Sequence, residues 1–189
     1  NEFVDNAEHL AKLKEIAVEC GFIAPIYTVT GWNSASGAKI PVDEVVPVFG
    51  GYCEAPWENH MNRLSPSPHY FFNRMRNDSA IGTDLIAKTQ SDGWQLPYER
   101  YPFATCELGG GIEVTHHRRP IIKPMDIYAV SLVKLGDGNN LVGYYMYHGG
   151  TNKIGELSTF NETKATGYPN DYPILSYDFQ APLSEYGEV

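Results

Sequence analysis

The chain has 189 residues, enough for one ordinary domain, and it is acidic: 23 Asp and Glu against 14 Lys and Arg give a net charge of -9. This balance argues against nucleic acid as a partner, because a phosphate-binding surface needs clustered Lys and Arg. Three cysteines, Cys20, Cys53 and Cys106, are too few and too scattered for a disulfide framework or a zinc site, and no stretch approaches the roughly 20 apolar residues of a membrane span. The composition predicts one domain, residues 1–189, that binds neither nucleic acid nor membrane.

The first predicted elements are a helix and two strands. Asp5 and Glu8 have the spacing of a capping box, and Gly21 ends the helical pattern. The apolar positions between them fall on one helical face: Leu10, Leu13, Ile16, Ala17 and Cys20. A strand rich in β-branched and aromatic residues is expected over residues 22–30, and a second over residues 45–50, each followed by glycine.

The second half of the chain continues to alternate. Residues 65–88 begin with prolines and predict one or two helices with a break near Gly82. Residues 101–107 predict a third strand, residues 124–135 a helix and residues 141–147 a fourth strand. Strands that alternate with helices indicate parallel pairing through right-handed crossovers, which makes this an α/β protein.

The third strand delivers a carboxylate to its end. Residues 101–106 are mostly apolar, Glu107 follows them, and three glycines at 109–111 force a sharp turn or a close approach. Catalytic groups of (β/α)8 barrels lie at such strand ends, so Glu107 is a candidate active-site residue. A structural ion pair between Glu107 and Arg118 or Arg119 is the alternative.

Three blocks of sequence resemble those of one enzyme family. Residues 1–3 (Asn-Glu-Phe) look like the end of its Glu-Asn-Glu-Tyr strand, and residues 144–152 read Tyr-Tyr-Met-Tyr-His-Gly-Gly-Thr-Asn. Residues 176–185 (Ser-Tyr-Asp-Phe-Gln-Ala-Pro-Leu-Ser-Glu) are similar to its Ser-Tyr-Asp-Tyr-Asp-Ala-Pro-Leu-Xaa-Glu motif. The blocks stand in the family's order, and the chain thereby resembles the family 35 glycoside hydrolases, the β-galactosidases, over nearly its whole length.

The resemblance implies a (β/α)8 TIM barrel that is only partly present. A closed barrel takes about 250 residues. Residues 1–189 would be the C-terminal half of the catalytic barrel, with the end of strand four and strands five to eight. The missing N-terminal half would then be a required partner, since open strand edges leave backbone groups unpaired. The family implies a secreted or periplasmic protein.

The resemblance also implies a site and a chemistry. It implies a retaining glycosidase that removes terminal β-galactosyl residues from a galactoside or plant-type polysaccharide without metal or organic cofactor. Glu107 would be the nucleophile and Glu2 the acid/base. The implied sugar-binding residues are Asn1, Tyr177, Trp32 and Tyr147, in line with the 13% aromatic content.

The chain departs from the family at three places around this implied site. Residues 108–111 (Leu-Gly-Gly-Gly) remove an aromatic wall, Lys153 stands where the family usually has Phe, and Phe179 replaces a Tyr. These changes bear on which sugar is accepted, because hydroxyl contacts discriminate strongly between substrates. A non-catalytic carbohydrate-binding or structural barrel fragment is the alternative function.

Overall fold

The computed structural model describes most of the chain in seven segments. They are residues 7–29, 39–55, 60–76, 78, 96–114, 118–156 and 175–189. The helices are α1 (Ala7–Glu19) and α2 (Pro124–Gly136), with short 3-10 turns η1 (Pro68–Tyr70) and η2 (Tyr98–Arg100). The strands are β1 (Tyr27–Val29), β2 (Val46–Gly51), β3 (Thr105–Gly109), β4 (Tyr144–Tyr145), β5 (Gly150–Thr151) and β6 (Ser176–Tyr177).

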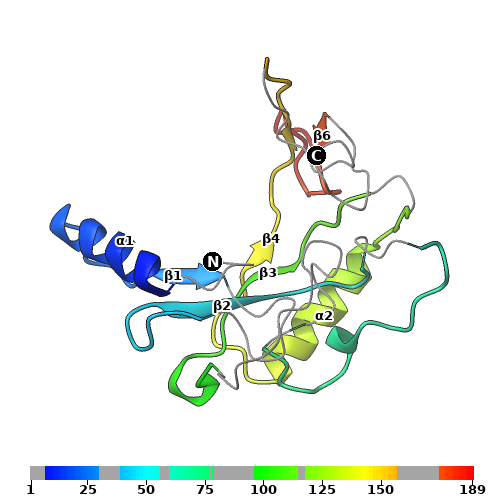
Figure 1. Ribbon diagram of the computed structural model, residues 1–189. Helices are drawn as coiled ribbons and strands as arrows, with labels where there is room; N and C mark the ends of the chain where they lie inside the picture. Colours follow the sequence, from blue (N-terminus) through cyan, green and yellow to red (C-terminus); the bar gives the residue numbers. More distant parts are fainter. Residues whose placement is uncertain are drawn as a thin grey trace.

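The first four strands form one parallel sheet in chain order, β1-β2-β3-β4, which confirms the predicted parallel pairing (Figure 1). Because the strands are parallel and sequential, their carboxyl ends lie along the same edge of the sheet. The strands β5 and β6 form a separate antiparallel pair beyond that edge, and β6 and the C-terminus lie above it in Figure 1. The described strands therefore form an open parallel sheet whose carboxyl edge faces the C-terminal segment.

Three of the predicted strands differ in extent from the observed ones. Pairing in the first begins at Ile26, whose carbonyl accepts from Val46, because Pro25 before it has no N–H to give. The third strand is β3, which starts later than residue 101 and runs on to Gly109. The fourth is reduced to a bridge at Leu141 and the two residues of β4.

The helical prediction for residues 65–88 is wrong for its first part. Residues 65–76 contain only η1, whose cap is the Ser67 side chain. Pro66 and Pro68 cannot donate to a helical ladder, and the Asn73 side chain bonds the Pro68 carbonyl and the Met75 N–H instead. Residues 79–88 lie outside the described part of the chain.

Helix α2 supports the site from behind the sheet, and its predicted range is confirmed. Pro124 occupies the first turn, and the Asp126 carboxylate accepts from the Lys123 N–H at 2.9 Å. Its central residue Val130 is fully buried. The core that it closes consists of Tyr52, Cys53, Leu108, Ile112 and Val130. The carboxyl ends of β2 and β3 are thereby packed against a helix (Figure 1).

Helix α1 ends where the glycine signal predicts, and the predicted capping residue Asp5 lies outside the described residues; none of the helix residues is buried. Leu10 packs on a small core of Ile40, Val45 and Leu96. Leu13 and Ile16, on the same predicted face, are 49% and 44% exposed. The amphipathic pattern is thus present, and only part of its apolar face is covered by the described residues.

Candidate active site

The candidate site lies near the carboxyl ends of β2 and β3. Glu107 is not the last residue of its strand, contrary to the sequence prediction, because pairing with β2 and β4 continues beyond it, to Gly109 at the end of β3. Gly50 and Glu107 are Cα partners across the two strands, and the register shifts between Phe49 and Gly50. Such an irregularity re-aims the side chains that follow it. Tyr52, immediately after β2, and Glu107 are thereby turned toward the same point on the sheet's edge.

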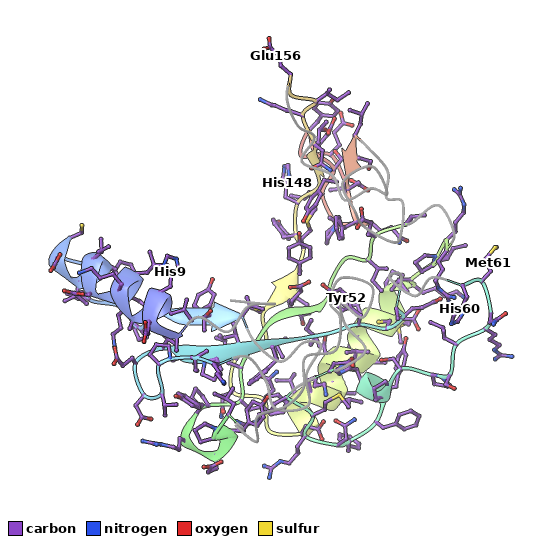
Figure 2. All side chains as sticks on the ribbon, in the orientation of Figure 1. His9, Tyr52, His60, Met61, His148 and Glu156 are labelled. Carbon is purple, nitrogen blue, oxygen red and sulfur yellow. The ribbon has the colours of Figure 1, made fainter. Side chains whose placement is uncertain are left out.

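The Tyr52 hydroxyl donates a hydrogen bond to Oε1 of Glu107. Tyr52 is only 6% exposed, and Figure 2 shows it in the interior of the molecule beside β3. Burial, then the charge of Glu107 and the hydrogen bond to it, raise the pKa of the Tyr52 phenol well above its ordinary value. Tyr52 is therefore a neutral donor at physiological pH that holds the carboxylate in one orientation.

A cluster of three aromatic residues stands beside this pair. The Tyr145 and Tyr177 hydroxyls are hydrogen-bonded to each other, and Phe179 packs on both rings, at centroid distances of 5.5 Å and 4.4 Å. Burial, the bond to Tyr177 and the charges of Tyr177, Glu107 and Glu113 all raise the pKa of Tyr145. The charge of Glu107 therefore raises the pKa of two tyrosines, Tyr52 just after β2 and Tyr145 on β4.

Close packing at Gly111 brings the aromatic cluster to the sheet. A Cβ at Gly111 would lie 2.7 Å from the Phe179 carbonyl oxygen, so a larger residue there would push that segment away. The Ile112 N–H donates to the same carbonyl at 2.7 Å. Gln180 adds side-chain bonds to the Ile112 and Pro120 carbonyls at 3.0 and 3.3 Å. The glycine run after β3 thus serves as a dock for residues 177–180.

The two later family-like blocks, residues 144–152 and 176–185, are also joined by backbone hydrogen bonds. The Gly149 N–H donates to the Leu183 carbonyl at 2.7 Å, and the Leu183 N–H donates to the Tyr147 carbonyl at 3.1 Å. The strands β5 and β6 pair Gly150 with Tyr177. These bonds hold the segment after β4, which rises to His148 in Figure 2, against the C-terminal residues.

The predicted site residues have different outcomes. Glu107 and Tyr177 come to the same edge of the sheet, linked through Tyr145. The Tyr147 side chain is 71% exposed. Asn1, Glu2 and Trp32 lie outside the described residues. Arg118, the alternative structural partner of Glu107, forms an ion pair with Glu54 at 2.6 Å.

Sequence reasoning missed Tyr52 and Tyr145. A signal for Tyr52 existed, since it directly follows Gly50-Gly51 at the end of a predicted strand, just as Glu107 stands beside the glycines that end its own strand. Tyr145 stands in a run with Tyr144 and Tyr147, and the sequence does not say which of them points at the carboxylate.

The described part of the chain holds no group of three or more His, Cys, Asp or Glu side chains arranged to bind a metal ion. Neither of its α-helices is long and apolar enough to cross a membrane.

The fold and the site define an α/β protein that presents a carboxylate, bonded by a tyrosine, among aromatic rings at the carboxyl edge of a parallel sheet. Residues 37–189 match the model of glycosyl hydrolases family 35, and the chain belongs to that family.

Two plant proteins illustrate the similarity. Beta-galactosidase 3 of Oryza sativa subsp. japonica is 41% identical over 86 residues, which are 45% of this chain and 9% of that protein. Beta-galactosidase 10 of Arabidopsis thaliana is 39% identical over 66 residues, which are 34% of this chain and 7% of that protein. The match thus spans less than a tenth of either relative's length. No solved structure matches the chain.

Proposed function

We propose that this chain is the C-terminal half of the catalytic barrel of a retaining glycoside hydrolase, which removes terminal β-galactosyl residues from oligo- or polysaccharides. Membership of glycosyl hydrolases family 35 supports the reaction class, and the names of the plant relatives support the sugar. The observation that carries the proposal is Glu107 in the carboxyl half of β3, hydrogen-bonded by Tyr52 and close to Tyr145, which is itself hydrogen-bonded to Tyr177.

In this proposal Glu107 is the nucleophile. Its Oε2 atom attacks the anomeric carbon, the bond to the aglycone breaks, and a covalent glycosyl-enzyme forms. The Tyr52 hydroxyl keeps the other oxygen in place, so that the attacking atom needs little reorientation. As the carboxylate becomes an ester its charge is lost, and water hydrolyses that ester in the second step.

Glu2 is the proposed acid/base, and Asn1 beside it the proposed contact to the sugar. Protonation of the leaving oxygen and later activation of water require a second carboxyl group about 5 to 5.5 Å from the nucleophile. Residues 1–6 lie outside the described part of the chain, so this pairing rests on the family resemblance. Trp32 and Tyr147 remain proposed sugar contacts on the same ground.

The aromatic cluster supports sugar binding. The apolar C–H face of a pyranose packs on an aromatic ring, while hydroxyls at the rim bond the sugar's own hydroxyls. Tyr145 and Tyr177 supply both kinds of contact, and Phe179 supplies a ring without a hydroxyl. This pattern suits a pyranose held by rings from β4 and β6.

The missing N-terminal half of the barrel is the proposed partner. Leu13 and Ile16 of α1 are about half exposed, as expected for a helix with an unfilled neighbour position. We call the longer protein that contains both halves the parent enzyme.

The Glu107→Gln variant of the parent enzyme tests the proposal with a nitrophenyl galactoside as substrate. An amide of the same shape cannot attack, so turnover falls by orders of magnitude while galactoside binding is kept. Unchanged hydrolysis would remove Glu107 from the nucleophile role. Lost binding with an intact fold would favour a structural role instead.

A further inference from the structure

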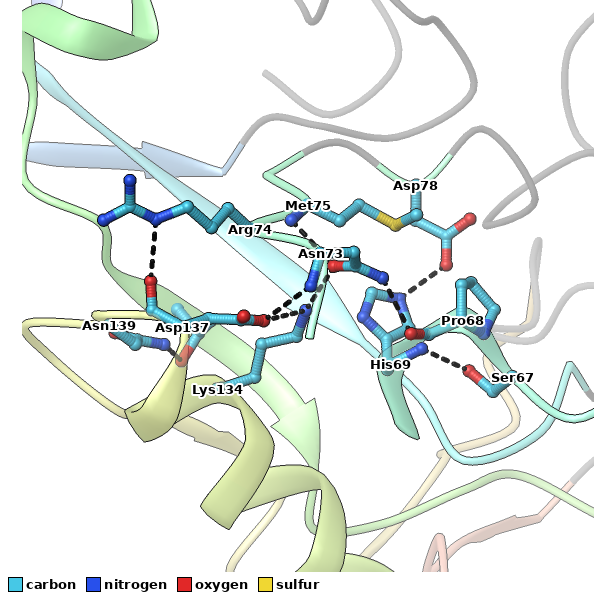
Figure 3. A network of polar contacts seen from close by, with 11 residues as sticks. Ser67, Pro68, His69, Asn73, Arg74, Met75, Asp78, Lys134, Asp137 and Asn139 are labelled. Carbon is cyan, nitrogen blue, oxygen red and sulfur yellow. Dashed lines mark hydrogen bonds and ion pairs between the residues drawn. The ribbon is translucent and has the colours of Figure 1, made fainter. Parts of the chain in front are cut away.

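A buried histidine-carboxylate pair lies behind the end of β2, outside the aromatic cluster (Figure 3). His69 is 1% exposed, and its Nε2 lies 2.7 Å from Oδ2 of Asp78. An ionised carboxylate only accepts hydrogen bonds, so the Nε2 atom carries the proton. The other ring nitrogen, Nδ1, is buried and has no hydrogen-bond partner among the described residues. Leaving a buried polar atom unpaired costs free energy, and this placement therefore calls for an explanation.

The ring of His69 packs against the backbone of Gly51. A Cβ at Gly51 would lie 2.8 Å from Nδ1 and 2.9 Å from Cε1 of His69. The imidazole thus fills the volume that any other residue at position 51 would need for its side chain. Since Gly51 immediately precedes Tyr52, the position of the ring fixes where β2 delivers that tyrosine.

The turn that carries His69 also holds Tyr52 directly. The Ser67 hydroxyl donates to the Tyr52 carbonyl at 2.6 Å and accepts from the His69 N–H at 3.3 Å. At the end of the turn, the Tyr70 hydroxyl donates to the Asp126 carboxylate of α2 at 3.0 Å. The backbone on both sides of the Gly51–Tyr52 peptide is therefore fixed by one small turn, itself tied to α2.

We propose that His69, anchored by Asp78, is a positioning residue that sets the orientation of the Tyr52 hydroxyl toward Glu107. It touches no substrate. Hydrogen bonds weaken steeply with misalignment, so a small shift of Gly51 would loosen the bond that holds Glu107. Any consequence for catalysis rests on the proposed function of Glu107, whereas the orientation of Tyr52 does not.

The test reads the Tyr52 phenol itself. In the parent enzyme, 3-fluorotyrosine incorporated at position 52 reports ionisation of the phenol by fluorine NMR across the alkaline pH range. The groups that act on the phenol are Glu107 and Cys106 of β3 and Tyr145 of β4, and none of them is altered. Only the contact between position 51 and the His69 ring is changed.

The principal variant is Gly51→Ala, which pushes a methyl group into the His69 ring. The matched control is Gly136→Ala near the end of α2, where the added Cβ would lie 2.5 Å from the Phe72 ring and away from Tyr52. Both place a methyl against an aromatic ring. We expect the titration midpoint of the phenol at position 52 to fall by roughly one pH unit or more in Gly51→Ala, because one charge-assisted hydrogen bond that the neutral phenol donates is lost. The midpoint should be unchanged in Gly136→Ala.

Equal midpoints in two folded variants would overturn the proposal. If Gly51→Ala fails to fold, Asp78→Ala decides, because it removes the carboxylate that anchors the His69 ring and leaves Tyr52 and Glu107 unaltered. A lowered midpoint there supports the proposal, and an unchanged one refutes it. Hydrolysis should fall with the midpoint, by about tenfold. If Glu107→Gln keeps full hydrolysis, the proposed function fails, and the titration still decides whether His69 positions Tyr52.

Discussion

Replacing Tyr52 by phenylalanine removes one oxygen from the site and little else. The ring belongs to the core with Leu108 and Val130, and phenylalanine keeps that packing. What is lost is the hydrogen bond to the Glu107 carboxylate. Hydrogen bonds to charged groups contribute about 1.5 to 3 kcal/mol, and each 1.36 kcal/mol is a factor of about ten in rate. We therefore expect kcat/KM of the parent enzyme to fall by about 10- to 150-fold.

The assay is hydrolysis of a nitrophenyl galactoside, with circular dichroism to verify the fold. The matched control is Tyr98→Phe. Tyr98 is also largely buried and packs on Phe49 at 5.5 Å, but its hydroxyl is buried without a hydrogen-bond partner in the part of the chain that the structure describes. Removing that hydroxyl should leave the rate unchanged and should not destabilise the protein. A rate for Tyr52→Phe within a factor of about two of the unmodified enzyme would refute the reasoning, since losing a hydrogen bond that orients the nucleophile should lower the rate by more than that.

Three other predictions concern ionisation and assembly. Burial raises the pKa of Tyr98 to about 12, so the neutral phenol stabilises the fold fully below the unfolded pKa near 10, and this stabilisation is lost as the pH rises from there through the folded pKa. The free energy of unfolding measured with urea should therefore fall by roughly 1 kcal/mol at about pH 11, and by less in Tyr98→Phe. Burial raises the pKa of the Cys53 thiol to about 11, so iodoacetamide at neutral pH should label exposed Cys20 first, and mass spectrometry finding Cys53 labelled equally fast would contradict this burial. Residues 1–189 alone should hydrolyse galactosides poorly, and adding the N-terminal half should restore activity; rates of about 1 to 1000 per second from the isolated chain would exclude the half-barrel proposal.

The helices α1 and α2 could be predicted from sequence because their signals are local, whereas residues 65–76, predicted as helix, carry prolines that prevent one. Gly21 has a φ of +86° just beyond α1, a conformation that glycine adopts without strain. Pro124 and Asp126 begin α2 through contacts within four residues of each other. Such signals do not depend on distant parts of the chain, so the predicted and observed bounds agree closely.

Strand lengths and side-chain directions could not be predicted in the same way, since they are set by pairing partners far along the chain. Residues 141–147 look like one strand, but Leu141 forms only an isolated bridge with Ala104, just before β3, and only β4 pairs with β3 itself. Which tyrosine approaches Glu107 depends on that register, and Tyr145 does so while Tyr147 is largely exposed. The direction of the Tyr52 side chain depends on a shift of strand register between Phe49 and Gly50 that the sequence does not reveal.

The role of Glu107 is the central claim, and covalent trapping tests it most directly. A 2-deoxy-2-fluoro galactoside with a good leaving group slows both chemical steps and lets the glycosyl-enzyme accumulate, because fluorine destabilises the oxocarbenium-like transition states. Peptide mass spectrometry of the parent enzyme should then find the sugar attached to Glu107, and the Glu107→Gln variant should remain unlabelled. Attachment to a different carboxylate, or full labelling of that variant, would contradict the account.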